Sequence, residues 1–257
     1  MYVYLYDNFL KKKKFVTTLR AIEHKLMDFG ISGKILRLQQ FVDPRRMIED
    51  EIRRGVKTIV IVGNDDTFAY VLSKAATIDT TFGFIPVGPN NSMAEVLGIP
   101  SGDGACDVLS KRRIESLDIG TVSNKNKYFI AKLEIPAAAI AVSYDDLFTA
   151  SSSTGLAELI VTNLIPYEWN RRWSNLTTVR PQDRQLDAFF RPLVKHGVVR
   201  KVLEDPSVFQ FRILEVESID GYPFEVYIDG HMSKEKHIVI SMAKERIRVI
   251  VGRDRQF

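Results

Sequence analysis

The sequence has little of three things that mark specialised classes of protein. It contains one cysteine, Cys106, so no disulfide can form within the chain, and this usage fits a reducing compartment. Its longest apolar run, residues 135–142, is far below the roughly 20 residues of a membrane-spanning helix. It also lacks a strong charge of one sign, because 36 basic and 32 acidic residues leave a net charge of +4.

These absences narrow the protein classes that remain. The apolar residues at the N-terminus precede the lysines, which is the reverse of a secretory leader. We therefore expect a cytoplasmic protein whose contact with a membrane, if it has one, is peripheral. No nucleic-acid partner is expected, since neither a basic stripe nor RNA-binding aromatic signatures are present. The weak basic excess leaves phosphate ligands and anionic surfaces open.

The first part of the chain alternates between strand and helix patterns. A helix is expected where apolar residues recur every three or four positions from Val16 to Phe29, and another after the capping pair Asp43-Pro44. Apolar, β-branched runs predict strands over residues 2–6, 34–38, 58–62 and 82–87. The alternation predicts an α/β domain, residues 1–115, with a mostly parallel sheet.

The second part of the chain is expected to be a β-rich, antiparallel domain, residues 116–257. Turn pairs such as Gly221-Tyr222, Asp229-Gly230 and Asp205-Pro206 separate its apolar runs. Strands are expected over residues 116–122, 129–133, 209–216, 223–228, 238–241 and 247–251. Residues 143–178 show no clear pattern.

The turn that follows the buried run 58–62 is the first candidate site. Its residues are Gly63, Asn64, Asp65, Asp66 and Thr67. Ligands collect at the carboxyl ends of parallel strands, and free amides at a helix start favour phosphate. Asp65 is then placed to act as a base or to help hold magnesium. The alternative is that Asp65 and Asp66 only turn the chain and cap the helix.

Two motifs in this region resemble the catalytic core of the diacylglycerol kinase and sphingosine kinase superfamily, which includes bacterial lipid kinases. Gly63, Asp65 and Thr67 match its Gly-Gly-Asp-Gly-Thr turn. A second turn and its tail also match, through Ile85, Pro86, Gly88, Asn91, Ala94 and Leu97-Gly98-Ile99-Pro100. Weaker matches follow in the family's order at Leu117-Asp118-Ile119-Gly120, Val161-Thr162-Asn163, Pro181, Leu186-Asp187 and Tyr227-Ile228-Asp229-Gly230.

The resemblance implies an ATP- and Mg²⁺-dependent kinase that transfers a phosphoryl group to a lipid hydroxyl. Asp65 would be its catalytic residue, and Asp187 and Asp229 would assist the metal. The implied nucleotide-binding residues are Gly63, Asn64, Asp66, Thr67, Gly88, Asn90 and Asn91. The implied partners are a nucleotide and a lipid acceptor, and a homodimer is a further possibility that does not come from the resemblance.

Departures from the family pattern support an alternative function. Asn64 and Asp66 replace glycines of the first turn, Pro89 and Ser92 replace a Thr and an Asp of the second, and His231 replaces a Glu. A catalytically silent relative that binds a nucleotide, a lipid or a protein is therefore the second hypothesis.

Other features allow more than one interpretation. The run Lys11 to Lys14 suits the phosphate crevice, an anionic lipid surface or plain solvent. Trp169 and Trp173, with arginines between them, suit a partner surface or a partly buried helix. His196 and His231 lack the ligand spacing of a zinc site.

Overall fold

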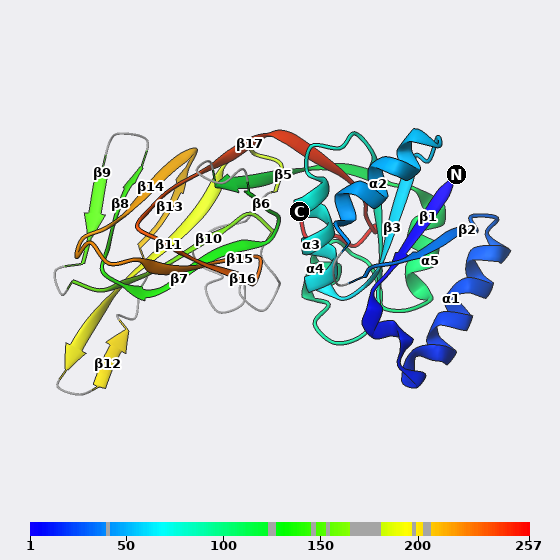
Figure 1. The fold of residues 1–257 in the computed structure, drawn as a ribbon, viewed down its shortest axis with the longest axis horizontal. Helices are drawn as coiled ribbons and strands as arrows, with labels where there is room; N and C mark the ends of the chain where they lie inside the picture. The colour runs from blue at the N-terminus through cyan, green and yellow to red at the C-terminus, as the bar shows by residue number, and fades with distance from the viewer. Residues whose placement is uncertain are drawn as a thin grey trace. The chain divides into compact units, whose positions relative to one another are not determined.

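The computed structural model describes residues 1–39, 42–122, 127–144, 148–152, 155–164, 181–196, 199–202 and 207–257. Among these, side chains are described outside 194–202. The chain forms two compact units (Figure 1). Unit 1 contains Met1–Leu117 and Glu245–Phe257, and unit 2 contains the described residues between 118 and 244. Within the described residues, no helix has the length and apolar character needed to cross a membrane.

Unit 1 is built on a parallel sheet. Its strands are β1 (Tyr2–Tyr6), β2 (Gly33–Arg37), β3 (Thr58–Gly63), β4 (Thr81–Pro86) and the end of β17 (His237–Ile250). They lie in the order β2-β1-β3-β4-β17, and each neighbouring pair is parallel. Every residue of β3 and β4 is buried. This burial on both faces explains why their sequences are continuous apolar runs.

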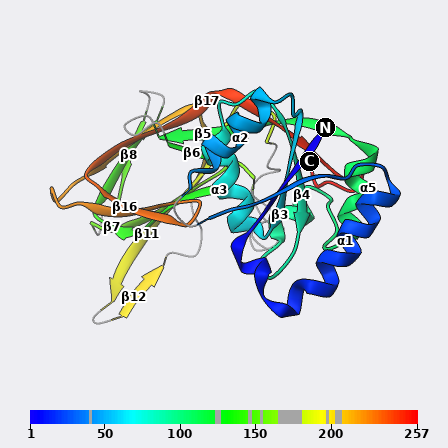
Figure 2. The same cartoon turned by 45° about the vertical axis from the view of Figure 1, so that its right-hand side comes forward.

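Helices cover both faces of this sheet. They are α1 (Val16–Asp28), α2 (Pro44–Arg53), α3 (Asp65–Ala75), α4 (Ser92–Val96) and α5 (Gly104–Lys111). Helices α2 and α3 pack on one side, and α1 and α5 pack on the other (Figures 1 and 2). Two 3-10 turns, η1 (Asn8–Lys11) and η2 (Lys13–Phe15), connect β1 to α1.

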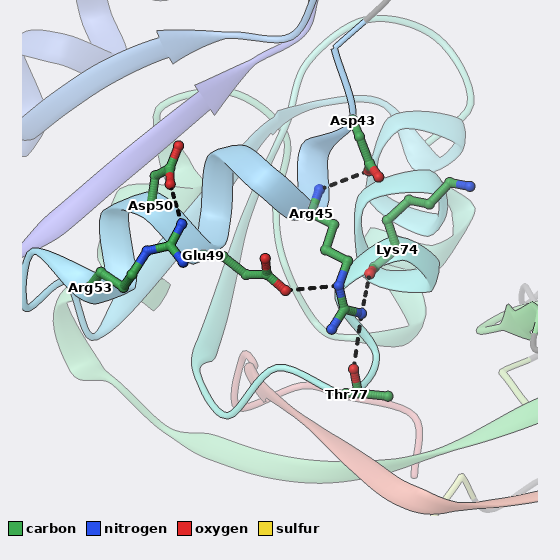
Figure 3. A network of polar contacts seen from close by, with 7 residues as sticks. All are labelled: Asp43, Arg45, Glu49, Asp50, Arg53, Lys74 and Thr77. Carbon is green, nitrogen blue, oxygen red and sulfur yellow. Dashed lines mark hydrogen bonds and ion pairs between the residues drawn. The ribbon is translucent and has the colours of Figure 1, made fainter.

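A polar network fixes α2 against the end of α3 (Figure 3). Asp43 caps α2 by accepting a hydrogen bond from the Arg45 amide at 3.0 Å. The Arg45 guanidinium pairs with Glu49 at 2.8 Å and donates to the Thr77 hydroxyl at 3.0 Å. The predicted Asp43-Pro44 start is therefore confirmed, and the residue after it, Arg45, links two helices.

The C-terminal segment packs on the end of α4. The Gly252 amide donates to the Leu97 carbonyl, and the Gln256 amide donates to the Val96 carbonyl, both at 2.9 Å. The two backbones approach so closely that a Cβ on Gly252 would lie 1.7 Å from the Gly98 carbonyl oxygen. Glycine is therefore required at position 252 for the segment to reach α4.

Unit 2 consists of two antiparallel sheets that enclose one apolar core. One sheet has the order β12-β11-β10-β7-β15-β16 with β13 beside β11, and the other continues from β17 through β14 and β8 to β9. Side chains from both sheets, including Leu133, Leu159, Val216 and Ile240, share the core. The strand bounds are β5 (Ile114–Val122), β6 (Lys127–Phe129), β7 (Lys132–Ala138), β8 (Ile140–Tyr144), β9 (Phe148–Ser151), β10 (Ala157–Thr162), β11 (Leu186–His196), β12 (Val199–Val202), β13 (Ser207–Phe211), β14 (Ile213–Ser218), β15 (Phe224–Ile228) and β16 (His231–Glu235).

The predicted fold class, a parallel α/β part followed by an antiparallel β part, is confirmed. Several boundaries differ from the predicted ones. The run 209–216 is two strands that break at Arg212, whereas the two predicted strands 238–241 and 247–251 are one strand, β17, which ends at Ile250. Because β17 pairs with both β14 and β4, the last residues return to unit 1 instead of ending a domain 116–257. The Asp205-Pro206 turn and the tryptophan pair lie outside the described residues.

Candidate functional site

The turn after β3 is the capped start of a helix. Asn64 is the N-cap of α3, and its side-chain oxygen accepts from the Thr67 amide at 3.1 Å. Its amide nitrogen donates to the exposed Asp66 carboxylate at 3.1 Å. Asparagine is among the best N-cap residues because its oxygen satisfies an otherwise free helix amide. Asp65, Asp66 and Thr67 therefore form the first turn of α3 and not a separate loop.

Gly63 makes room for that helix start. A Cβ at this position would lie 2.7 Å from the Thr67 hydroxyl and 2.9 Å from its Cβ. The Gly63 carbonyl accepts from the Val87 amide at 2.7 Å, which joins the end of β3 to the end of β4. The glycine is thus required here for close packing within the protein.

Asp7 joins the site from the end of β1, although sequence analysis gave it no role. The Thr67 hydroxyl donates to the Asp7 carboxylate at 2.6 Å, and the Asp7 amide donates to the Val62 carbonyl at 2.9 Å. The Asp7 carboxylate also caps η1 through the Phe9 amide. One signal was present: Asp7 directly follows a predicted strand, where the carboxyl ends of parallel strands gather ligands.

Replacing Thr67 with valine is expected to lower the free energy of unfolding by about 1–2 kcal/mol, because the Asp7 carboxylate loses its hydroxyl donor. Urea denaturation measures the change. Thr17→Val, at an exposed position in the first turn of α1, is the matched control and should cost less than about 0.5 kcal/mol. Equal effects of the two substitutions would contradict the assigned hydrogen bond.

Asp65 is buried and points toward the start of α4. Its side chain is 9% exposed, and its carboxylate accepts from the Met93 amide at 2.8 Å, while the neighbouring amides of Ala94 and Ser92 also favour its charged form. The Asp65 amide donates to the Asn90 carbonyl at 2.9 Å. One carboxylate therefore joins the first turn of α3 to that of α4, where free amides favour a negative charge.

Burial dominates the electrostatics of this carboxylate. It raises the pKa of Asp65 from 3.8 to about 6, although the amides of α4 act in the opposite direction. The nearby Asp66 carboxylate adds to the rise. A pKa near 6 lies in the range in which a carboxylate serves as a general base at neutral pH.

Two buried side-chain oxygen atoms of this region lack a hydrogen-bond partner among the described residues. They are the Oδ1 atoms of Asp65 and Asn91. Asn91 donates from its other side-chain atom to the Gly88 carbonyl at 2.8 Å. Oxygen donors of this kind suit a hard cation such as Mg²⁺. The residues present therefore fit magnesium by donor type.

The second turn carries a left-handed backbone at two positions. Gly88 has φ +100° and Asn90 has φ +63°. A Cβ on Gly88 would also lie 3.1 Å from the Phe9 ring, whose centroid is 5.4 Å from that of Phe15. Glycine is therefore needed at position 88 for both conformation and space. The exposed run Lys11 to Lys14 lies between the two phenylalanines.

The two acids predicted to assist a metal, Asp229 and Asp187, lie in unit 2, and the surroundings of their carboxylates differ. The Asp229 carboxylate accepts from the amides of Ile130, Ala131 and Lys132 at 2.8–3.0 Å, so it fixes the turn into β7. Asp187 is 4% exposed, and its burial raises its pKa to about 6. Among the described residues, no group of three or more acidic, histidine or cysteine side chains is arranged to hold a metal.

Sequence analysis did not predict that Arg184 and Asn163 bind the buried residue Asp118 in unit 2. Asp118 is fully buried and accepts from the Arg184 amide at 2.8 Å and from its guanidinium at 3.3 Å. The Asn163 side chain donates to the Asp118 carbonyl at 2.5 Å. The motif positions 118 and 163 are therefore structural contacts that join β5 to the end of β10. His231 is exposed at the start of β16.

Comparisons with known proteins agree with this fold. Residues 3–122 match the family model of the diacylglycerol kinase catalytic domain. A crystal structure of a diacylglycerol kinase from Bacillus anthracis str. Sterne superposes with a TM-score of 0.75 at 19% identity, covering 98% of this chain and 97% of that chain. An NAD kinase from Archaeoglobus fulgidus in complex with ATP gives a TM-score of 0.63 at 14% identity, covering 99% and 95%. No curated protein matched.

The two solved structures show a fold of the lipid kinase and NAD kinase type. The family match spans β1 to β5 and includes both turns described above. Through residues 3–122, the chain is similar to the diacylglycerol kinase catalytic domain.

Proposed function

We propose that the protein is an ATP-dependent kinase that transfers the γ-phosphoryl group to a lipid hydroxyl. The observation that carries the proposal is the Asp65 carboxylate, buried at the carboxyl end of the parallel sheet, with a pKa of about 6 and one oxygen free of protein donors within the described residues. The family match over residues 3–122 supports the reaction class.

In this proposal, Asp65 accepts the proton of the acceptor hydroxyl. The hydroxyl oxygen then bonds to the γ-phosphorus, and the bond between the γ-phosphorus and the bridging oxygen of ADP breaks. The turns at Gly63 and Gly88 face the phosphates, with Asn64, Asp66, Thr67, Asn90 and Asn91 around them. Asn91 would help to hold magnesium, which neutralises phosphate charge when bound. Asp187 is proposed to assist from unit 2. Asp229 is less suited to that role, because backbone amides already bind its carboxylate.

One observation favours a catalytically silent relative that binds a nucleotide, a lipid or a protein. Side chains fill the first turn, where Asn64 and Asp66 bind each other, and the amides of α4 hold Asp65. A phosphate that approached this turn would meet the Asp66 carboxylate unless a cation lay between them. The two functions differ in turnover, and the silent relative could bind a lipid or a protein in place of a nucleotide.

Calorimetry with ATP, with and without Mg²⁺, and phosphoryl transfer to diacylglycerol in mixed vesicles test the proposal. We expect binding and turnover in the wild type and a loss of about 1,000-fold in rate for Asp65→Asn, as expected when a general base is lost. Asp28→Asn makes the same chemical change at an exposed site and should keep the wild-type rate.

The pH profile separates a base from a structural role. Since Asp65 must be ionised to accept a proton, the wild-type rate should fall as the pH drops below about 6. ATP binding without any transfer would favour the silent relative. If no nucleotide bound at all, both nucleotide-binding functions would be wrong.

A further inference from the structure

A cavity of about 420 Å³ lies in unit 1 beside the C-terminal segment. One wall is a face of α5, because its residues 104, 107, 108 and 111 recur at helical spacing. Another part of the lining is the segment from Val251 to Asp254. The full lining comprises Gly98, Pro100, Gly104, Asp107, Val108, Lys111, Arg113, Val251, Gly252, Arg253 and Asp254.

Three cations border this cavity. Within the described part of the chain, the side chains of Lys111, Arg113 and Arg253 make no hydrogen bond or ion pair, and all three residues are exposed. Of the two acids in the lining, Asp107 is bound by the Lys25 ammonium at 2.5 Å. Asp254 is exposed. The cavity therefore has an excess of positive charge.

The cavity walls are held by backbone contacts and do not depend on flexible side chains. The Val251 amide donates to the Arg113 carbonyl at 2.8 Å, and the Gly252 amide donates to the Leu97 carbonyl at 2.9 Å. A site that is formed before its ligand arrives loses less conformational entropy on binding. The cations thus project from a fixed frame, at the end of α4 opposite to the one that contacts Asp65.

We propose that this cavity binds a phosphate ester of a small polyol. Guanidinium groups match phosphate oxygens in pairs, and a lysine adds a point charge. Arg113, Arg253 and Lys111 bind the phosphate, and Asp254 accepts from a hydroxyl of the polyol. Pro100 and Val108 cover the carbon skeleton. The volume lies within the range of small-molecule sites, roughly 300–1,000 Å³.

Titration calorimetry with glycerol 3-phosphate tests the proposal. In the triple variant K111Q/R113Q/R253Q, the affinity is expected to fall by about tenfold or more, because the charge-assisted contacts to phosphate are removed. The control R20Q/R46Q/K57Q removes the same charge at other positions of unit 1 and should stay within about twofold. Equal losses in the two variants would overturn the site, since only overall charge would then matter.

A further variant and a second ligand identify the source of the phosphate. Asp254→Ala should weaken binding of glycerol 3-phosphate relative to binding of inorganic phosphate, because the acceptor for the hydroxyl is lost while the change in charge acts on both ligands. If the triple variant loses binding only to vesicles of phosphatidylcholine with phosphatidylglycerol, the same site takes a lipid headgroup. If neither glycerol 3-phosphate nor those vesicles bind the wild-type protein, the proposal is wrong.

Discussion

Replacing Gly252 with alanine is expected to lower the free energy of unfolding by about 3 kcal/mol, the upper part of the usual range for overpacking. The added methyl would lie 1.7 Å from the Gly98 carbonyl oxygen and 2.5 Å from its carbon. Both neighbours are backbone atoms, so the clash is relieved only if the C-terminal segment leaves α4. Urea denaturation followed by circular dichroism measures the loss.

Gly30→Ala is the matched control. Gly30 has φ +64°, and no atom lies within 4 Å of the position that an added methyl group would take. Alanine there should therefore cost about 1 kcal/mol, from backbone strain alone. A loss for Gly252→Ala no larger than the loss for Gly30→Ala would show that the segment does not pack as described.

Asp65→Asn is expected to change the pH dependence of stability. The folded-state pKa of about 6 lies above the reference value of 3.8, so the folded protein holds a proton that the unfolded chain releases between these values. The cost of the buried charge is fully present above pH 6 and disappears as the pH falls toward 3.8. By linkage, this cost is about 3 kcal/mol at neutral pH.

The measurement compares unfolding free energies of the wild type and Asp65→Asn at pH 7.5 and at pH 4.5, values about 1.5 units on either side of the folded-state pKa. Relative to the variant, the wild type should gain stability on going to the lower pH. Asp187 shifts in the same direction, but it is present in both proteins and its contribution cancels. Parallel pH profiles would contradict the raised pKa of Asp65.

Unit 1 was largely predictable because its strands β3 and β4 are buried along their whole length. Continuous apolar runs identified these strands, and Asp43-Pro44 identified the start of α2. Helix α5 was missed, since it is short and starts with a glycine. Strand β17 was predicted as two strands because the charged residues 244–246 interrupt its apolar pattern.

The candidate site was predictable in position and not in its contacts. The first turn was found from the buried strand before it and from its family resemblance. The contact between Thr67 and Asp7, and the amides of α4 that bind Asp65, depend on which strands lie side by side. No local sequence pattern predicts that β1 lies next to β3. The roles of Gly63 as packing space and Asn64 as a cap likewise became visible only with the neighbouring side chains in place.

The double pairing of β17 has a consequence for the order in which the chain can fold during synthesis. Strands β1 to β4 leave the ribosome early, but the outer edge of β4 pairs with Arg248 and Val249 of β17. In unit 2, β14 also pairs with β17. Until β17 emerges, each sheet therefore has an open edge, and such edges favour association with other chains. We expect a nascent chain that stops before β17 to depend on chaperones for its solubility.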